Sequence, residues 1–136
     1  MTAHDKERLL ANFNGNPPAD ASAVRQFEAE FHLRLAEDYV QFLEWVNGGE
    51  GFIGKNVYII LWRVEELLEM NTAYHVAEYA PGLFLFGSDG GGEAFAFDTR
   101  SDANQIVSVP FVGMELSLAR ALAPNFGQFL EKLYQS

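Results

Sequence analysis

The sequence predicts an α+β fold in which helices pack on a mainly antiparallel sheet. Apolar residues repeat with helical spacing in some segments and form short β-branched and aromatic runs in others, in the order helices, strands, helix, strands, helix. Short connections join the strand-like segments of the second half, and such connections favour antiparallel neighbours. The chain has 136 residues, 49% of them hydrophobic, so we expect a single domain over residues 1–136 with its own core.

The first part of the chain predicts three helices. A short opening helix ends near Asn12, before the turn-forming run at residues 14–18. A second helix follows Asp20, which is a candidate N-cap, and ends near Phe31. The third helix spans residues 36–46, and the glycines after it supply the left-handed conformation in which helices often end.

The rest of the chain alternates between strands and helices. Strands at 52–54 and 57–62 are joined by a tight turn and followed by a helix over residues 64–78. We expect Leu67 and Leu68 of this helix to face inward, with Tyr74 and His75 as further candidates for the same face. Three further strands are expected at residues 83–86, 93–98 and 105–109. Residues 116–123 form a connection, with a helical turn as one alternative, and Pro124 suits the first turn of a closing helix.

The charge of the chain excludes some partners. There are 9 Lys and Arg residues against 19 Asp and Glu residues, a net charge of −10, and a phosphate backbone is bound mainly through Lys and Arg. We therefore expect no nucleic-acid partner, and the acidity serves either solubility or the attraction of a basic partner. No apolar run approaches the about 18 residues of a membrane helix. With no signal-peptide pattern and no cysteine, the expected location is cytoplasmic.

A glycine-rich run, Gly-Ser-Asp-Gly-Gly-Gly-Glu, occupies residues 87–93. A phosphate-binding Walker loop needs Lys and Ser or Thr after its last glycine, where this chain has Glu93. A dinucleotide-binding fingerprint opens a helix, whereas residues 94–97 continue as a strand. Two carboxylates are too few for an EF-hand. We expect a turn in which glycine supplies positive φ and Asp89 caps the backbone, with contact to a partner as an additional role.

No residue pattern indicates a metal, cofactor or catalytic site. His4, His32 and His75 are scattered, and they lack the spacing of zinc ligands. Acidic pairs at helix starts are expected from the helix dipole alone. Asp98 and Asp102 flank a turn, where aspartate is common, although they also support an alternative, a small hydrolase that uses clustered carboxylates. We expect a protein that is not an enzyme.

Two stretches carry a family pattern. In residues 27–49, Phe-Glu-Ala-Glu-Phe leads to Glu-Asp-Tyr, Phe-Leu and Asn-Gly-Gly, and residues 85–98 contain the glycine-rich run and the strand after it. Together they resemble the SUKH superfamily, which includes SMI/KNR-type cell-wall-assembly regulators of fungi and many bacterial proteins. The resemblance covers about residues 21–133, although Ala36 replaces a usual proline and residues 111–123 have no counterpart. The residues that carry the pattern are Tyr39, Phe42, Gly48, Gly49, Gly87, Gly90, Gly91, Gly92, Phe97 and Asp98.

This resemblance implies a strongly twisted sheet and binding without catalysis. Bacterial members are immunity proteins that neutralise polymorphic toxins, often nucleases, so the resemblance implies a protein partner such as a basic nuclease toxin. The fungal members supply the alternative, a regulatory scaffold without a toxin partner. No cofactor is expected. The candidate partner-binding residues are Asp89, Glu93, Glu37, Asp38 and Glu44.

Overall fold

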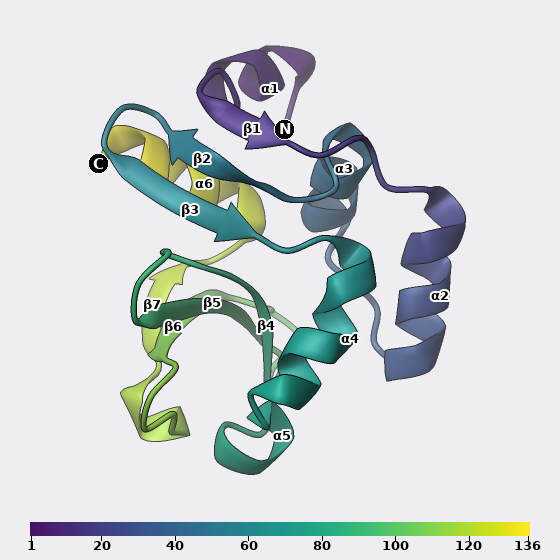
Figure 1. The fold of residues 1–136 in the computed structure, drawn as a ribbon, viewed down its shortest axis with the longest axis vertical. Coiled ribbons are helices and arrows are strands. Elements are labelled where there is room, and N and C mark those ends of the chain that lie inside the picture. The colour runs from purple at the N-terminus through teal and green to yellow at the C-terminus, as the bar shows by residue number, and fades with distance from the viewer.

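The computed structural model describes residues 1–136 as six helices and one antiparallel sheet of seven strands, which confirms the α+β prediction (Figure 1). Each strand pairs with its neighbour in the sequence, so the sheet order runs from β1 to β7 without a crossover. The elements are α1 (Ala3–Leu9), β1 (Phe13–Gly15), α2 (Ala21–Phe31), α3 (Glu37–Trp45), β2 (Gly49–Ile53), β3 (Val57–Leu61), α4 (Val64–Ala73), α5 (Val76–Tyr79), β4 (Leu83–Ser88), β5 (Glu93–Asp98), β6 (Ile106–Pro110), the short 3₁₀ helix η1 (Leu116–Leu118), β7 (Arg120–Ala123) and α6 (Phe126–Gln135).

The sheet twists so strongly that its two halves diverge between β3 and β4 (Figure 1). These strands pair only where Ile60 meets Ser88 and Leu61 meets Gly87. Beyond that point the buried side chain of Asn71 on α4 takes the place of a strand. Its amide donates to the Leu85 carbonyl at 3.0 Å and its oxygen accepts from the Leu85 N–H at 2.9 Å. A helix thereby satisfies the β4 backbone that β3 leaves unpaired.

The main core lies between one face of the sheet and the helices α3 and α6. Tyr39 of α3 is fully buried, with its ring centroid 5.1 Å from that of Phe97 and 5.0 Å from that of Phe126. Phe86 of β4 and Phe129 of α6 join this cluster, their centroids 5.7 Å apart. The family-pattern residues Tyr39 and Phe97 therefore hold the two helices on the sheet.

The opposite face of β4, β5 and β6 is covered by α4, α5 and the segment around η1. Side chains alternate along a strand, so Ala94 and Ala96 point away from Phe95 and Phe97. Both alanines are fully buried, as is Leu85. Residues 116–123, predicted as a connection, contain the 3₁₀ helix η1 and the strand β7, which pairs with β6.

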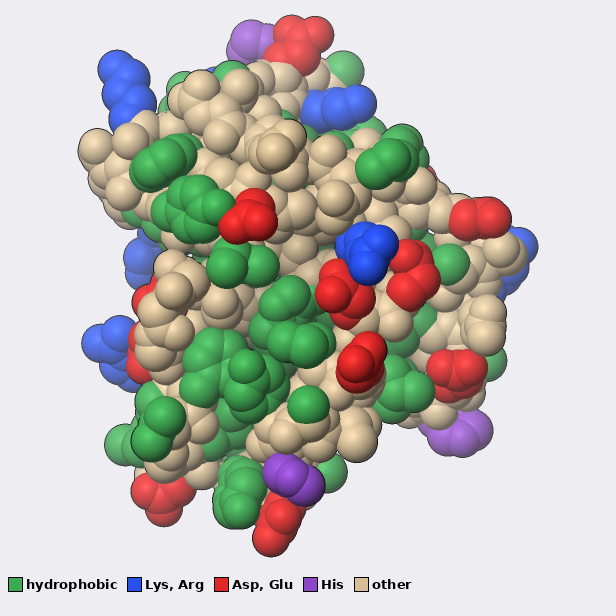
Figure 2. Space-filling view, viewed as in Figure 1, with side chains coloured by type: hydrophobic (Ala, Val, Ile, Leu, Met, Phe, Trp, Pro, Cys, Tyr) green, Lys and Arg blue, Asp and Glu red, His purple; other side chains and the backbone are tan.

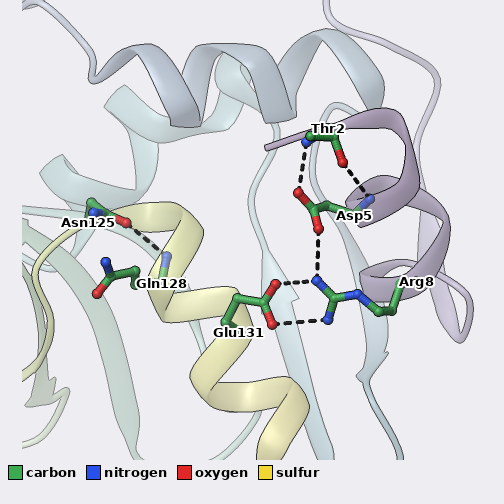
Figure 3. A network of polar contacts seen from close by, with 6 residues as sticks. All are labelled: Thr2, Asp5, Arg8, Asn125, Gln128 and Glu131. Carbon is green, nitrogen blue, oxygen red and sulfur yellow. Dashed lines mark hydrogen bonds and ion pairs between the residues drawn. The ribbon is translucent and has the colours of Figure 1, made fainter.

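A polar network ties the N-terminal helix to the C-terminal one (Figure 3). Arg8 pairs with Asp5 at 2.9 Å and forms a two-pronged ion pair with Glu131 of α6. Thr2 and Asp5 form a capping box, and hydrogen bonds from the Thr2 backbone and from Arg8 lower the pKa of Asp5 to about 2. The Arg8 guanidinium also lies 4.9 Å from the ring centroid of Tyr134. Residues distant in the sequence are therefore joined at this edge.

The strands β1 and β7 were not predicted, because each forms through pairing with a neighbouring strand and not from its local sequence. β1 has three residues, and its Asn-Gly composition is typical of a turn, yet Phe13 pairs with Gly51 of β2. β7 has the sequence Arg-Ala-Leu-Ala, which lacks the β-branched residues of a typical strand. Both lie at an edge of the sheet. Local propensity was weak there, and tertiary pairing decided the structure.

Several predicted helix boundaries were wrong. The helix expected over residues 64–78 breaks at His75, which has a left-handed φ of 52°. Leu67 is buried as predicted, whereas Leu68, Tyr74 and His75 are exposed and do not face inward. The third helix, α3, ends at Trp45, one residue earlier than predicted, and its C-cap Val46 is extended, before Gly48 with its φ of 69°. Pro124 precedes α6. Asn125 is the N-cap of that helix, and its side chain accepts from the Gln128 N–H at 2.8 Å.

Candidate protein-binding surface

The glycine-rich run forms a tight loop, residues 89–92, between β4 and β5. The Asp89 carboxylate accepts from the N–H groups of Gly91 at 2.7 Å and Glu93 at 3.2 Å, so it caps the turn as the sequence predicts. Gly90 has a φ of 80°, which favours glycine. Gly87 is needed for another reason, because a Cβ there would lie 2.4 Å from the carbonyl oxygen of Ile60. The loop is fixed by its own hydrogen bonds and is exposed at its tip.

This loop lies between two aromatic pairs. A methyl group added at Gly90 would lie 3.8 Å from both Tyr58 and Ile60 of β3, and Tyr58 packs edge-to-face on Phe52 at a centroid distance of 5.3 Å. On the other side, the Gly92 carbonyl accepts from the N–H of Phe111, whose ring centroid is 4.6 Å from that of Tyr74. We call this set the front surface; its members are Phe52, Tyr58, Ile60, Tyr74, Phe111 and the loop 89–92.

The front surface exposes several aromatic side chains. Phe52, Tyr58 and Tyr74 are 42%, 39% and 37% exposed. Val112, next to Phe111, is 91% exposed. Figure 2 shows hydrophobic side chains gathered between β3 and α5, with acidic side chains beside them along α4. Contiguous exposed apolar surface of this kind marks interaction sites in soluble proteins.

The sequence contained a signal for this surface that our prediction did not use. The run Val-Tyr-Ile-Ile-Leu of β3 is apolar at every position, so both faces of the strand carry apolar side chains. Ile59 and Leu61 are buried toward the helices. Tyr58 and Ile60 must then lie on the opposite face, where Tyr58 remains exposed.

Acidic groups border the front surface. Glu50 of β2 accepts a hydrogen bond from the Tyr58 hydroxyl at 2.5 Å, which raises the pKa of Tyr58. Asp89 lies on the loop, and Glu93 is half-buried at the start of β5. The four ion pairs of the chain involve none of these three carboxylates. Their negative charge is therefore available to a partner.

The family of the chain follows from its match to a family model. Residues 18–132 match the SMI1 / KNR4 family (SUKH-1). The chain belongs to this family. The match confirms the predicted SUKH resemblance, and it begins after α1 and β1. No curated protein gives a significant match. Membership supports an immunity or regulatory module in general.

The other predicted carboxylates of this SMI1 / KNR4 chain lie on a different part of the surface. Glu37, Asp38 and Glu44 of α3 line a groove of about 620 Å³, together with Glu28 and Arg34. Residues 33–36, which lead into α3 beside this groove, lie near Phe84, Phe97 and Thr99. These three residues are at the end of the β4–β5 hairpin opposite the glycine loop. The five candidate residues thus form two separate groups, one at each end of the hairpin.

Asp38 has a structural partner of its own. One carboxylate oxygen accepts from the Gly127 N–H at 3.0 Å, and the other accepts from the Tyr39 N–H at 2.8 Å. Gly127 lies in the first turn of α6, where backbone N–H groups lack helical partners. Asp38 therefore fixes α3 against the start of α6, while Glu37 and Glu44 remain exposed.

The family-pattern residue Asp98 has a structural role, in which it binds the side chain of Arg100. Its carboxylate is buried and accepts from the Arg100 guanidinium at 2.9 and 2.8 Å. These hydrogen bonds lower the pKa of Asp98 to about 2, which keeps it ionised and unsuited to act as a general acid. Asp102 is exposed in the adjacent turn. This arrangement gives the hydrolase alternative no support.

The chain has a further cavity and no metal-ligand cluster. A cavity of about 510 Å³ between α2 and α5 is lined by Phe31, Leu33 and Phe84 and contains one carboxylate, Glu78. No three His, Cys, Asp or Glu side chains are grouped so that they could hold a metal ion. None of the helices has both the length and the apolar character needed to cross a bilayer.

Proposed function

We propose that this SMI1 / KNR4 chain is a non-catalytic immunity protein that neutralises a basic protein toxin, most directly a nuclease, by binding it through the front surface. The observation that carries the proposal is the exposed aromatic surface around the glycine loop, bordered by unpaired carboxylates. A few residues supply most of the binding energy at protein interfaces, Trp and Tyr are enriched among them, and the contacts around them exclude water.

Charge supports the choice of a basic partner. The net charge of −10 attracts a positively charged protein, and complementary charge mainly accelerates association. A nuclease binds phosphates through Lys and Arg, so its substrate-binding surface suits an acidic partner. The protein acts in the cytoplasm, where an incoming nuclease meets nucleic acid.

The five candidate carboxylates have different roles in this proposal. Asp89 uses one oxygen to cap the loop, and no hydrogen bond involves its second oxygen, which can pair with a Lys or Arg of the toxin. Glu93 lies beside it. Glu37 and Glu44 offer a second, weaker contact at the α3 groove, and the oxygens of Asp38 already bind backbone N–H groups.

The test uses a toxin encoded beside the gene for this chain. We expect the purified protein to bind that toxin and to inhibit its nuclease activity in a cleavage assay. Tyr74→Ala should weaken binding about tenfold or more, since it removes an exposed aromatic anchor. Tyr79→Ala is the matched control, because Tyr79 is 52% exposed but lies on α5 and contacts His75.

Two results would contradict the proposal. A cognate toxin that is inhibited equally by the wild-type and Tyr74→Ala proteins would exclude the front surface. A chain that binds a cellular protein through the front surface without protecting cells from any neighbouring toxin would favour the regulatory alternative.

A further inference from the structure

One end of the front surface combines two aromatic rings with a carboxylate. In the antiparallel pairing of β2 and β3, Phe52 lies opposite Tyr58 and Glu50 lies opposite Ile60. Glu50, Phe52 and Tyr58 share one face of the sheet because they stand at alternate positions of their strands. The Tyr58 hydroxyl donates to Glu50, so the carboxylate is held beside the rings.

No cation of the chain uses this cluster. The cation–π contacts of the protein are Lys6 over Trp45 and Arg8 over Tyr134. Glu50 forms no ion pair. A carboxylate has about four acceptor sites, and Tyr58 occupies one of those on Glu50. The exposed part of the Phe52–Tyr58 pair and most of the acceptor capacity of Glu50 therefore remain unused in the free protein.

We infer that Glu50, Phe52 and Tyr58 form a receptor for an arginine side chain of the protein partner, an inference that rests on the proposed function. A guanidinium group is planar, so it stacks on an aromatic face while its N–H groups donate to a neighbouring carboxylate. An ammonium group is a compact point charge and uses only one of these contacts well. The negative charge of Glu50 and the exposed rings match the first chemistry.

The binding of arginine can be measured without a partner. We would titrate the full-length ¹⁵N-labelled protein with N-acetylargininamide and follow the backbone amides by NMR. The expected result is a saturable shift of the Phe52 and Tyr58 signals, with affinity in the millimolar range. N-acetylcitrullinamide, a neutral analogue of similar shape, should give a shift at least about threefold smaller, because the ion pair and cation–π contacts require the charge.

Two conservative variants test the two halves of the receptor. Glu50→Gln keeps an acceptor for Tyr58 but removes the charge, and Phe52→Leu keeps an apolar side chain but removes a ring. Each should weaken binding of N-acetylargininamide about threefold or more. Glu69→Gln, which alters an exposed carboxylate on α4, should leave it unchanged. Equal shifts from the arginine and citrulline probes, or unchanged binding by Glu50→Gln, would overturn the inference.

The receptor and the proposed function can fail separately. If a toxin is neutralised but Glu50→Gln and Phe52→Leu bind it with unchanged affinity, the arginine receptor is wrong and the immunity proposal stands. If N-acetylargininamide binds the cluster but no neighbouring toxin is neutralised, the receptor stands and the immunity proposal is wrong.

Discussion

Aromatic side chains gather in two places in this fold, one on each side of the twisted sheet. In the main core, Phe86, Phe126 and Phe129 are fully buried between the sheet and the helices. On the front surface, Phe52 and Tyr58 pair in a similar edge-to-face geometry but remain about two-fifths exposed. The residue types are the same, and the difference is which face a helix covers. Core aromatics therefore contribute to stability, and those of the front surface remain available for binding.

The largest expected effect comes from making the same truncation in both groups. Phe126→Ala should lower the free energy of unfolding by about 4 kcal/mol, because it removes a fully buried ring and leaves a cavity. Phe52→Ala should cost about 1 kcal/mol or less, because much of its ring already contacts water. Urea unfolding followed by circular dichroism measures both values. Similar costs for the two variants would mean that the front surface is part of the stabilising core.

Two glycines of the glycine-rich run offer a second comparison. Gly87 lies against the backbone of β3, whereas Gly92 has open space around it. Gly87→Ala should cost roughly 2 to 3 kcal/mol, because the new Cβ would lie 2.4 Å from the Ile60 backbone oxygen. Gly92→Ala meets no atom within 4 Å and should change stability by less than about 0.5 kcal/mol. Thermal unfolding of the two variants gives the difference. A neutral Gly87→Ala would show that β3 and β4 can separate without cost.

How much of this could be predicted from the sequence depends on whether local pattern or tertiary contact decides each element. α2 and α3, and the strands β5 and β6, were predicted closely, because their apolar spacing and turn residues agree with the fold. β1 and β7 exist through pairing with β2 and β6, which local composition does not report. The break at His75 requires a left-handed non-glycine residue, which propensity does not favour.

The candidate site was predicted in part. Asp89 was expected to cap its turn from residue type and position, and the structure has that hydrogen-bonding pattern. The front surface was not predicted, because it depends on which face of β2 and β3 the helices leave open. Phe52 and Tyr74 come from distant segments, and the loop joins them only in the folded chain.

The carboxylates of Asp98 and Asp89 show the same contrast between stability and binding. Asp98 is buried against Arg100, and its pKa of about 2 lies below the ordinary value of 3.8. A lowered pKa stabilises the fold above the ordinary value, and this stability is lost as the pH falls toward the folded-state pKa. Asp98→Asn should therefore cost about 1.5 kcal/mol at neutral pH, discounted because Arg100 is half exposed.

The same variant should flatten the loss of stability between about pH 4 and pH 2. Asp5, whose pKa is also about 2, still contributes to this loss, so the pH dependence should be reduced and not abolished. Urea unfolding at several pH values measures both effects. An unchanged acid profile for Asp98→Asn would mean that Arg100 does not hold the carboxylate in solution.

The smallest expected effect concerns Asp89, which is exposed and which we propose contacts the partner. Asp89→Asn keeps the oxygen that accepts from Gly91 and Glu93, so the loop should persist and the free energy of unfolding should change by less than about 0.5 kcal/mol. The lost charge should slow association with a basic toxin about twofold to threefold at low salt and reduce its salt dependence. Stopped-flow association with the cognate toxin measures this, and Glu115→Gln, outside the front surface, provides the control. An unchanged association rate would remove Asp89 from the contact region and leave it with the structural role that its hydrogen bonds already define.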